Sequence, residues 1–454
     1  MLRLKDSLQM NLFELMLPME LTKLSDELAK VDVLLDDERF LAPFIEHFTS
    51  NTGRPSIPME TYLRMMYLKF RHHMGYETLV KEVADSIKWR IFCRIPFDKD
   101  VPDDSTLVKL TKKFGPGAVE NLNLVLVDNA REKKLVRGGK LRTDTTVVEA
   151  NIHHPTDASL LADCVRVITR QAKKIKKQAV AVNTEFHDRT RSVKKQIYSI
   201  AKVLRRRTGE TVNEVRKIAG AIMEITETVV AQAEQVVAEA RQQTGDVAKK
   251  AERMVESLSS TVETARKVIA QTASVLQGNT HLKDRIVSIF DTDARPIMKG
   301  KLKSPTEFGM KVLIQDSENK IITRYQVLEG NPSDEELLIP AVDANIEIFG
   351  RPPTSVATDR GFASLTNEAA LLERGVKKVS LPRRGKLTKS RKKFQSQPWF
   401  KRLQRWRAGE EAQISLLKRR YGLDRSLSRG ARGTSSWVGF GVLAHNLWRV
   451  ASLT

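Results

Sequence analysis

Apolar residues recur at helical spacing through the first hundred residues and predict a series of short helices. One or two helices are expected over residues 12–47. Pro58 then suits the first position of a helix, and the apolar run that follows it closes near Gly75. Two more short helices are expected over residues 76–84 and 86–93. The pattern therefore predicts an all-helical N-terminal region.

A helix after Pro102 is expected to have two contrasting faces. Asp104 or Ser105 can cap its start. One face holds Leu107, Leu110 and Phe114, whereas Lys109, Lys112 and Lys113 lie on another. The lysines indicate either a helix that faces DNA or an ordinary solvated surface.

The pattern changes near residue 138. Residues 138–152 are rich in β-branched side chains, which favour a strand, and Asp144 lies inside it. Residues 157–277 are helical with coiled-coil spacing, interrupted at Gly209 and Gly245. We interpret them as a helical hairpin or small bundle inserted into another domain. Their apolar stripes favour packing between these helices, with dimerisation as the alternative.

Strand and helix patterns alternate after residue 281. Strands are expected over residues 308–315, 320–329, 354–358 and 376–381, and helices over 334–349, 366–374, 404–421 and 437–450, with a basic loop before the third of these helices. This order predicts a mixed α+β chain that contains a layered α/β domain with a central mixed sheet.

The charge balance points to a polyanionic partner. The 454 residues include 77 Lys and Arg against 55 Asp and Glu, a formal net charge of +22. Nucleic acid is the expected partner, because neutralised phosphates release counterions. A membrane surface is the rival, but no apolar run approaches transmembrane length and the first residues do not resemble a signal peptide, so a cytoplasmic protein is expected. Cys93 and Cys164 are expected to be plain thiols.

Acidic residues on separate elements suggest phosphodiester chemistry. Such cleavage needs charge stabilisation on the attacking and leaving oxygens, which two Mg²⁺ ions held by carboxylates supply. Asp144 lies in the first predicted strand, Asp359 directly follows a strand, and Glu410 or Glu411 lies in a late helix. Acids at strand ends are well placed to share a cleft.

Four sequence blocks carry a family resemblance. RTDTTVVEAN (142–151), DTDARP (291–296), EGNPSD (329–334) and ATDRGF (357–362) resemble, in that order, the blocks of DDE transposases with an RNase H-like catalytic fold. The closest similarity is to insertion-sequence transposases of the ISNCY type, within the wider set of insertion-sequence groups 4 and 5. GRP (53–55), PDDST (102–106) and WVGFGVLAHN (437–446) extend the resemblance over nearly the whole chain.

The family's late-helix signature selects one of the two glutamates. Related transposases place Arg four residues before the Glu and Lys seven after it. Counting from Glu411 gives Arg407 and Lys418, on one helix face, whereas counting from Glu410 gives no match. Gln404 stands where the signature has Tyr, so this chain departs from the family's pattern at that position.

The resemblance implies the reaction and its residues. Asp144, Asp359 and Glu411 would bind two Mg²⁺ ions, for which Mn²⁺ can substitute. Water would cleave a strand, and the transposon 3′-hydroxyl would then attack target DNA. Arg407 and Lys418 would hold phosphates, as would Arg360 unless it forms a salt bridge within the fold. Asp291 and Asp293 are the rivals for the first ligand.

The resemblance also implies an organisation and partners. We expect a helical DNA-binding domain over residues 1–120, an RNase H-like catalytic domain split between residues 121–156 and 281–454, and the helical insertion over residues 157–280. The expected function is a bacterial transposase acting on double-stranded DNA as a homodimer or higher oligomer. A structure-selective nuclease without strand transfer, and a non-catalytic DNA-binding protein derived from a transposase, are the alternatives.

Overall fold

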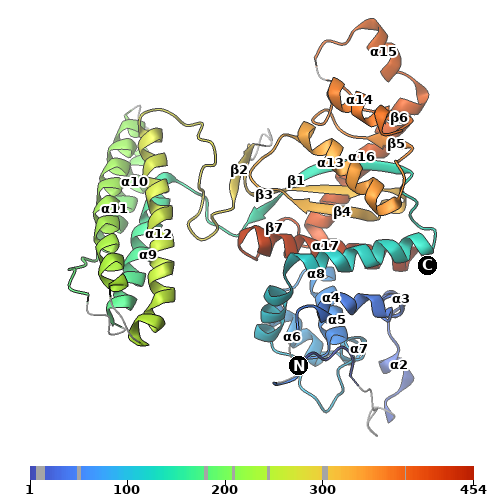
Figure 1. The fold of residues 1–454 in the computed structure, drawn as a ribbon, viewed down its shortest axis with the longest axis horizontal. Helices are drawn as coiled ribbons and strands as arrows, with labels where there is room; N and C mark the ends of the chain where they lie inside the picture. Colours follow the sequence, from blue (N-terminus) through green and yellow to red (C-terminus); the bar gives the residue numbers. More distant parts are fainter. Residues whose placement is uncertain are drawn as a thin grey trace. The chain divides into compact units, whose positions relative to one another are not determined.

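The chain forms two compact units in a computed structural model that describes residues 1–6, 16–48, 53–177, 182–206, 210–242, 246–298, 305–383 and 385–454. The first unit combines Met1–Asn151 with Gly309–Thr454, and the second is Ile152–Phe308. Figure 1 shows the elements of each unit. The second unit thus stands, in sequence, between two parts of the first.

The N-terminal part of the first unit is helical. It contains α2 (Met19–Thr22), α3 (Asp26–Leu35), the 3₁₀ turn η1 (Glu38–Phe40), α4 (Ala42–Ile45), α5 (Met59–Arg71), α6 (Tyr76–Asp85) and α7 (Ile87–Phe92). The helices expected around residues 58–75, 76–84 and 86–93 are confirmed. Residues 12–15 of the first expected helix lie outside the described residues.

The long helix α8 (Asp104–Glu132) follows. Its N-cap position is Asp103, so the expected cap at Asp104 or Ser105 was wrong by one or two residues. Gly115 bends the helix with φ of 67°. The predicted apolar face is confirmed, because Leu107, Leu110 and Phe114 are all buried.

A mixed sheet forms the centre of the first unit. Strand β1 (Lys140–Ala150) pairs antiparallel with β3 (Thr306–Asp316), which pairs antiparallel with β4 (Ile322–Val327). On its other side β1 runs parallel to β5 (Ser355–Ala357), and β5 runs parallel to β6 (Lys378–Ser380). The short β7 (Arg425–Ser426) pairs with the end of β1. This arrangement confirms the expected mixed sheet and is consistent with an RNase H-like fold.

Helices pack against the sheet from both faces. They are α13 (Asp334–Phe349), α14 (Leu365–Glu373), α16 (Pro398–Arg420) and α17 (Gly430–Leu453), whereas α15 (Lys389–Gln395) packs against α16. Leu141 of β1 packs with Leu338 of α13, whereas its neighbour Arg142 contacts α16. Because successive strand residues point to opposite faces, α13 and α16 cover opposite sides of β1.

Two expectations for this segment were wrong. The basic loop before α16 contains α15, whose start is capped by the Thr388 hydroxyl accepting from the Arg391 amide. Helix α16 begins at Pro398 rather than near residue 404, since proline is favoured in the first turn of a helix.

One hydrophobic core joins the N-terminal helices to the sheet. Helix α17 packs along α8, and Phe440 of α17 stacks on Phe70 of α5 with ring centroids 5.8 Å apart. Val148 of β1 and Ile314 of β3 belong to the same core. The site residues on the sheet are therefore held by packing that includes helices from both ends of the chain.

The second unit is a helical bundle with its own core. Its helices are α9 (Asp157–Lys177), α10 (Thr190–Arg206), α11 (Thr211–Arg241) and α12 (Asp246–Leu276), and it also contains β2 (Arg295–Met298). Val193, Ile222, Val229 and Leu258 of the predicted apolar stripes are buried together. The stripes thus contribute packing core within the unit, except that Leu204 at the end of the predicted α10 stripe is 55% exposed. Gly209 and Gly245, the predicted interruptions, lie outside the described residues.

Candidate active site

Asp144 and Asp359 occupy matching positions on neighbouring parallel strands. The β1–β5 ladder pairs Lys140 with Ser355 and Arg142 with Ala357. Continuing that register by two residues brings Asp144 level with Asp359, which follows the end of β5. Neighbouring strands lie about 4.8 Å apart, and residues in register point to the same face. The strand geometry therefore directs both acids toward the same end of the sheet.

A tight turn after β5 fixes the Asp359 carboxylate. Its Oδ1 accepts a hydrogen bond of 2.7 Å from the Gly361 amide. A Cβ atom at Gly361 would lie 3.0 Å from this oxygen and 2.8 Å from Oδ2 of Asp334. Only glycine fits between the two carboxylates without displacing one of them.

Asp334, at the start of α13, is an acid that the sequence interpretation did not single out. Its Oδ1 accepts from the Thr145 hydroxyl at 2.9 Å and lies 2.7 Å from the Lys311 ammonium. It thereby links β1, β3 and the Asp359 turn. The signal was present, because the EGNPSD block ends on this residue.

On the opposite face of β1, Arg142 fastens α16 to the sheet. The buried guanidinium donates to Asp316 of β3 in a bidentate pair, with Nη2 and Oδ2 2.6 Å apart. It also donates to the Trp406 carbonyl and, at 3.3 Å, to the Gln413 side chain. Charge-assisted contacts of this kind set both position and rotation of a helix. Asp144, two residues along β1, shares this face.

Glu410 of α16 lies within that buried cluster. The residue is fully buried, and within the described part of the chain neither carboxylate oxygen has a hydrogen-bond partner. Burial raises its pKa well above the ordinary value, and the negative charges of Asp316 and Asp144 act in the same direction. Burial also raises the pKa of Asp316, against the opposing effect of Arg142. Burial and the neighbouring carboxylates therefore disfavour the ionised form of Glu410.

Glu411 has the opposite environment. Its side chain is 66% exposed, and its Oε1 accepts from Nη2 of Arg407 at 3.1 Å. Lys418, two turns later, is half-buried. The predicted common face of Arg407 and Glu411 thus exists as an ion pair on the flank of α16.

The described ranges contain no group of three Asp, Glu, His or Cys side chains that lie close enough together to hold a metal ion. The rivals Asp291 and Asp293 belong to the second unit, whereas Asp144, Asp359 and Glu411 belong to the first.

The other predicted DNA contacts differ from one another. Lys109 is exposed, Lys112 lines a cavity, and the Lys113 ammonium lies 3.4 Å from the centre of the Phe48 ring. Arg360 is exposed, and no salt bridge to it is found in the described ranges of the chain.

None of the described helices is long and apolar enough to cross a membrane.

Comparison with known proteins identifies two domains. Residues 18–113 match the family described as "Transposase domain (DUF772)", and residues 262–447 match "Transposase DDE domain". The second match includes Asp334, Asp359 and both glutamates, whereas Asp144 lies outside both.

One curated relative aligns with part of the chain. "Uncharacterized protein ORF8 in nfe locus" of Rhizobium meliloti is 31% identical over 132 residues, which are 28% of this chain and 64% of that protein. The match therefore spans less than two thirds of the relative. No solved structure matches the chain.

The resemblance to DDE transposases is thereby confirmed at the level of domains, while the insertion-sequence group stays a prediction. The chain contains a transposase DDE domain, which belongs to a family of enzymes, over residues 262–447, together with a second transposase domain over residues 18–113.

Proposed function

We propose that the protein is a DNA transposase that binds the inverted-repeat ends of an insertion sequence, cleaves the DNA and joins the ends to target DNA. The observation that carries this proposal is the parallel β1–β5 register, in which Arg142 pairs with Ala357 and α16 packs on both strands; continued by two residues, this register would bring Asp144 level with Asp359. The DDE domain match over the second half of the chain supports it independently. Binding as a homodimer or higher oligomer is part of the proposal.

The carboxylates suit divalent metal ions. DDE transposases use divalent metals, and hard oxygen ligands are what Mg²⁺ and Mn²⁺ prefer. We assign Asp144, Asp359 and Glu411 as the ligands of two ions. Bound ions would supply charge stabilisation to the attacking and leaving oxygens of the phosphodiester. The chain itself fixes the Asp359 oxygen through the Gly361 amide and orients α16 through Arg142.

We choose Glu411 over Glu410 as the third ligand because of exposure and charge. A ligand of a catalytic ion must be reached by substrate phosphate and water, and Glu411 is open to solvent whereas Glu410 is fully buried. Burial also disfavours the ionised form of Glu410, and metal-binding carboxylates are ionised.

Basic residues beside these acids would position DNA. Arg407 is already hydrogen-bonded to Glu411, and its guanidinium can hold a phosphate next to the third carboxylate. Lys418 lies further along α16, and exposed Arg360 directly follows Asp359. Such contacts fix where the backbone lies without reading its sequence.

The test is cleavage of the element's own ends. Purified full-length protein, incubated with labelled duplexes taken from the repeats that flank the gene, is expected to nick them with Mg²⁺ or Mn²⁺ and not with EDTA. Asp359→Asn and Glu411→Gln should each lower the nicking rate at least about a hundredfold, because each removes a charged ligand. Full nicking by either variant contradicts the site.

Glu410→Gln is the matched control for Glu411→Gln. It makes the same chemical change one residue earlier and keeps the shape of a buried neutral acid, so we expect nicking within a few-fold of the unchanged protein. The reverse ranking of the two variants would move the third ligand to Glu410.

Strand transfer separates the proposal from its alternatives. Joining of cleaved ends to a target plasmid is expected of a transposase, whereas nicking without joining would indicate a nuclease. Metal-independent binding without any cleavage would indicate a non-catalytic DNA-binding protein.

A further inference from the structure

The first unit contains a cavity of about 760 Å³ at the N-terminal end of α17, which we call the α17 pocket. Lys69 of α5, Lys112 of α8, and Arg429 and Arg432 at the start of α17 line it. No acidic residue occurs among its described lining residues. A helix N-terminus adds partial positive charge to the same place. The α17 pocket thus concentrates positive charge from three separate elements.

Lys69 is the unusual member of this set. It is 1% exposed, and its ammonium is held between three rings, 4.3 Å from the centre of Phe70, 4.6 Å from Tyr76 and 4.1 Å from Trp437. No acid pairs with it in the described ranges of the chain. A buried cation without a counter-ion is costly, so the arrangement suits a site whose anion comes from a ligand.

Contacts with neighbouring residues hold the side chains that line the α17 pocket in place. The guanidinium of Arg432 lies so close to Gly115 of α8 that a Cβ atom there would be 2.6 Å from Nη2. The Trp437 indole donates to the Gly422 carbonyl at 2.7 Å, which fixes the ring beneath Lys69. Tyr76 is likewise held through its hydroxyl, 3.2 Å from that of Thr111.

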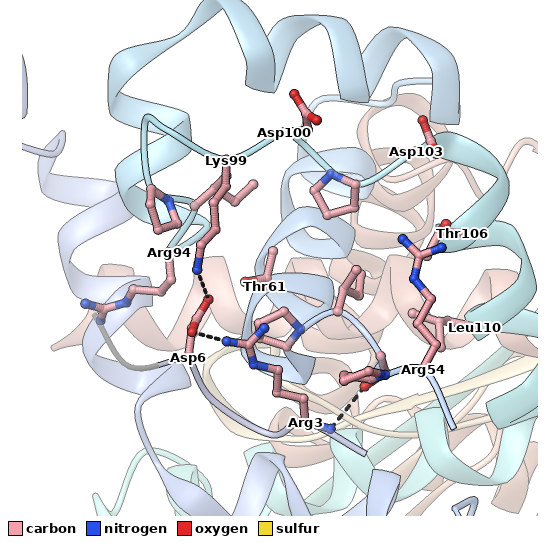
Figure 2. Close-up of a pocket in the computed structure, with 17 residues that line it drawn as sticks. Arg3, Asp6, Arg54, Thr61, Arg94, Lys99, Asp100, Asp103, Thr106 and Leu110 are labelled. Atoms are coloured by element: carbon pink, nitrogen blue, oxygen red, sulfur yellow. Dashed lines mark hydrogen bonds and ion pairs between the residues drawn. The ribbon is translucent and has the colours of Figure 1, made fainter. Parts of the chain in front are cut away.

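A second cavity, lined by residues between Arg3 and Leu110, differs from the α17 pocket in how its charges are balanced. Figure 2 shows this space of about 430 Å³, where Arg3 and Lys99 both bind the Asp6 carboxylate. Arg94, which also lines it, pairs with Asp32. Three of the four Lys and Arg residues that line it are thus paired with acids of the chain, and the acids Asp6, Asp100 and Asp103 line it as well, so it lacks the one-sided positive charge of the α17 pocket.

We propose that the α17 pocket binds a phosphate group of the DNA backbone, with Lys69 and Arg432 as its principal ligands. This inference rests on the proposed function, since it assigns DNA as the source of the phosphate. Lys112 connects the pocket to the exposed lysine face of α8, where a DNA strand can continue. The volume admits a phosphate together with its sugar.

The salt dependence of DNA binding tests the proposal. Each phosphate contact contributes about 0.9 to the slope of log K against log [salt]. For an arbitrary labelled duplex, Lys69→Met and Arg432→Gln in the full-length protein should each reduce the slope by about one and weaken binding on the order of tenfold at 0.1 M salt. A duplex of arbitrary sequence is sufficient, because contacts with phosphates do not read the base sequence.

Lys81→Met is the matched control. Lys81 is exposed on α6 and already paired with Glu77 at 2.8 Å, outside the pocket, so its removal should leave the slope unchanged. Wild-type slopes for both Lys69→Met and Arg432→Gln would overturn the proposal. Arg432 is exposed, so the second variant remains informative even if the first folds poorly.

Inorganic phosphate distinguishes the possible sources. If millimolar phosphate raises the melting temperature of the wild-type protein but not of Lys69→Met, while the DNA slopes of the variants are unchanged, the pocket belongs to small anions and the DNA assignment fails. Reduced slopes in a protein that never nicks its ends would support the pocket and refute the proposed catalysis. The experiments therefore distinguish a failure of the DNA assignment of the pocket from a failure of the proposed catalysis.

Discussion

Replacing Lys69 with methionine should stabilise the free protein near neutral pH. Burial lowers the pKa of Lys69 from 10.5 to about 7. One pKa unit corresponds to about 1.4 kcal/mol, so this interval represents about 5 kcal/mol of unfavourable burial of the charged form. The contacts of the ammonium with the aromatic rings offset part of this unfavourable free energy, by about 0.5–2 kcal/mol each. Methionine has a similar length and carries no charge, so a net gain of about 2 kcal/mol is expected at pH 6.

The gain should depend on pH in a defined direction. Between about pH 7 and 10.5 the unfolded chain binds a proton at Lys69 that the folded chain lacks, so stability of the unchanged protein rises with pH in this window. Below about pH 7 the whole cost is present. The advantage of Lys69→Met should therefore be largest at pH 6 and fade toward pH 10.

Urea unfolding followed by tryptophan fluorescence measures this difference. All five tryptophans lie in the first unit, so the signal reports the unit that contains Lys69. The other titratable lining groups, Tyr76, Lys112, Arg429 and Arg432, are present in both proteins and largely cancel in the comparison. A variant less stable than wild type at pH 6, or an advantage that grows with pH, would refute the assignment of a buried, uncompensated cation.

Three further changes follow from the structure. Gly138→Ala should destabilise the first unit by about 2–5 kcal/mol in urea unfolding, because Gly138 has φ of 64° and its Cβ would lie 2.3 Å from Cγ of Phe349; an unchanged midpoint would contradict this. Burial lowers the pKa of His445 to about 4, so the protein should lose up to about 3 kcal/mol as pH falls from 6.5 toward 4, and His445→Gln should flatten that loss. Burial raises the pKa of Cys93 and Cys164, so a thiol reagent should modify neither at pH 8 without denaturant; rapid native labelling would show that a thiol is accessible.

Local patterns predicted most of the secondary structure because local forces determine it. Helix α6 was expected over residues 76–84 and is Tyr76–Asp85, since its apolar spacing matches one buried face. Helix α15 was missed because its stability comes partly from a distant contact: Arg391 pairs with Glu368, 23 residues away, at 2.7 Å. No periodicity within seven residues encodes such a partner.

The strand positions of Asp144 and Asp359 were predictable from the order of elements along the chain, while their catalytic role stays a prediction. Asp144 and Asp359 could be inferred from strand ends and family blocks, and their common register then follows from parallel pairing. Asp334 and Lys69 were not inferred, because their environments depend on segments far away in sequence. Lys69 is buried by Trp437, and Asp334 contacts Thr145. In the sequence Lys69 looks like an ordinary surface charge, whereas the only signal for Asp334 is its place at the end of the EGNPSD block.

The two adjacent glutamates show how one helix position separates packing from chemistry. Successive helix residues point about 100° apart, so anchoring α16 through the Trp406 carbonyl directs Glu410 into the sheet and Glu411 toward solvent. If Glu410 were ionised, it would compete with Asp316 for the single Arg142 guanidinium at a cost of several kcal/mol. Burial and the charges of Asp316 and Asp144 thus favour the protonated form of Glu410, whereas the Glu411 carboxylate is open to solvent beside Arg407. The rotation of α16, rather than the identity of either residue, decides which of two identical side chains is buried and which reaches solvent, and in the proposed function the exposed one is the metal ligand.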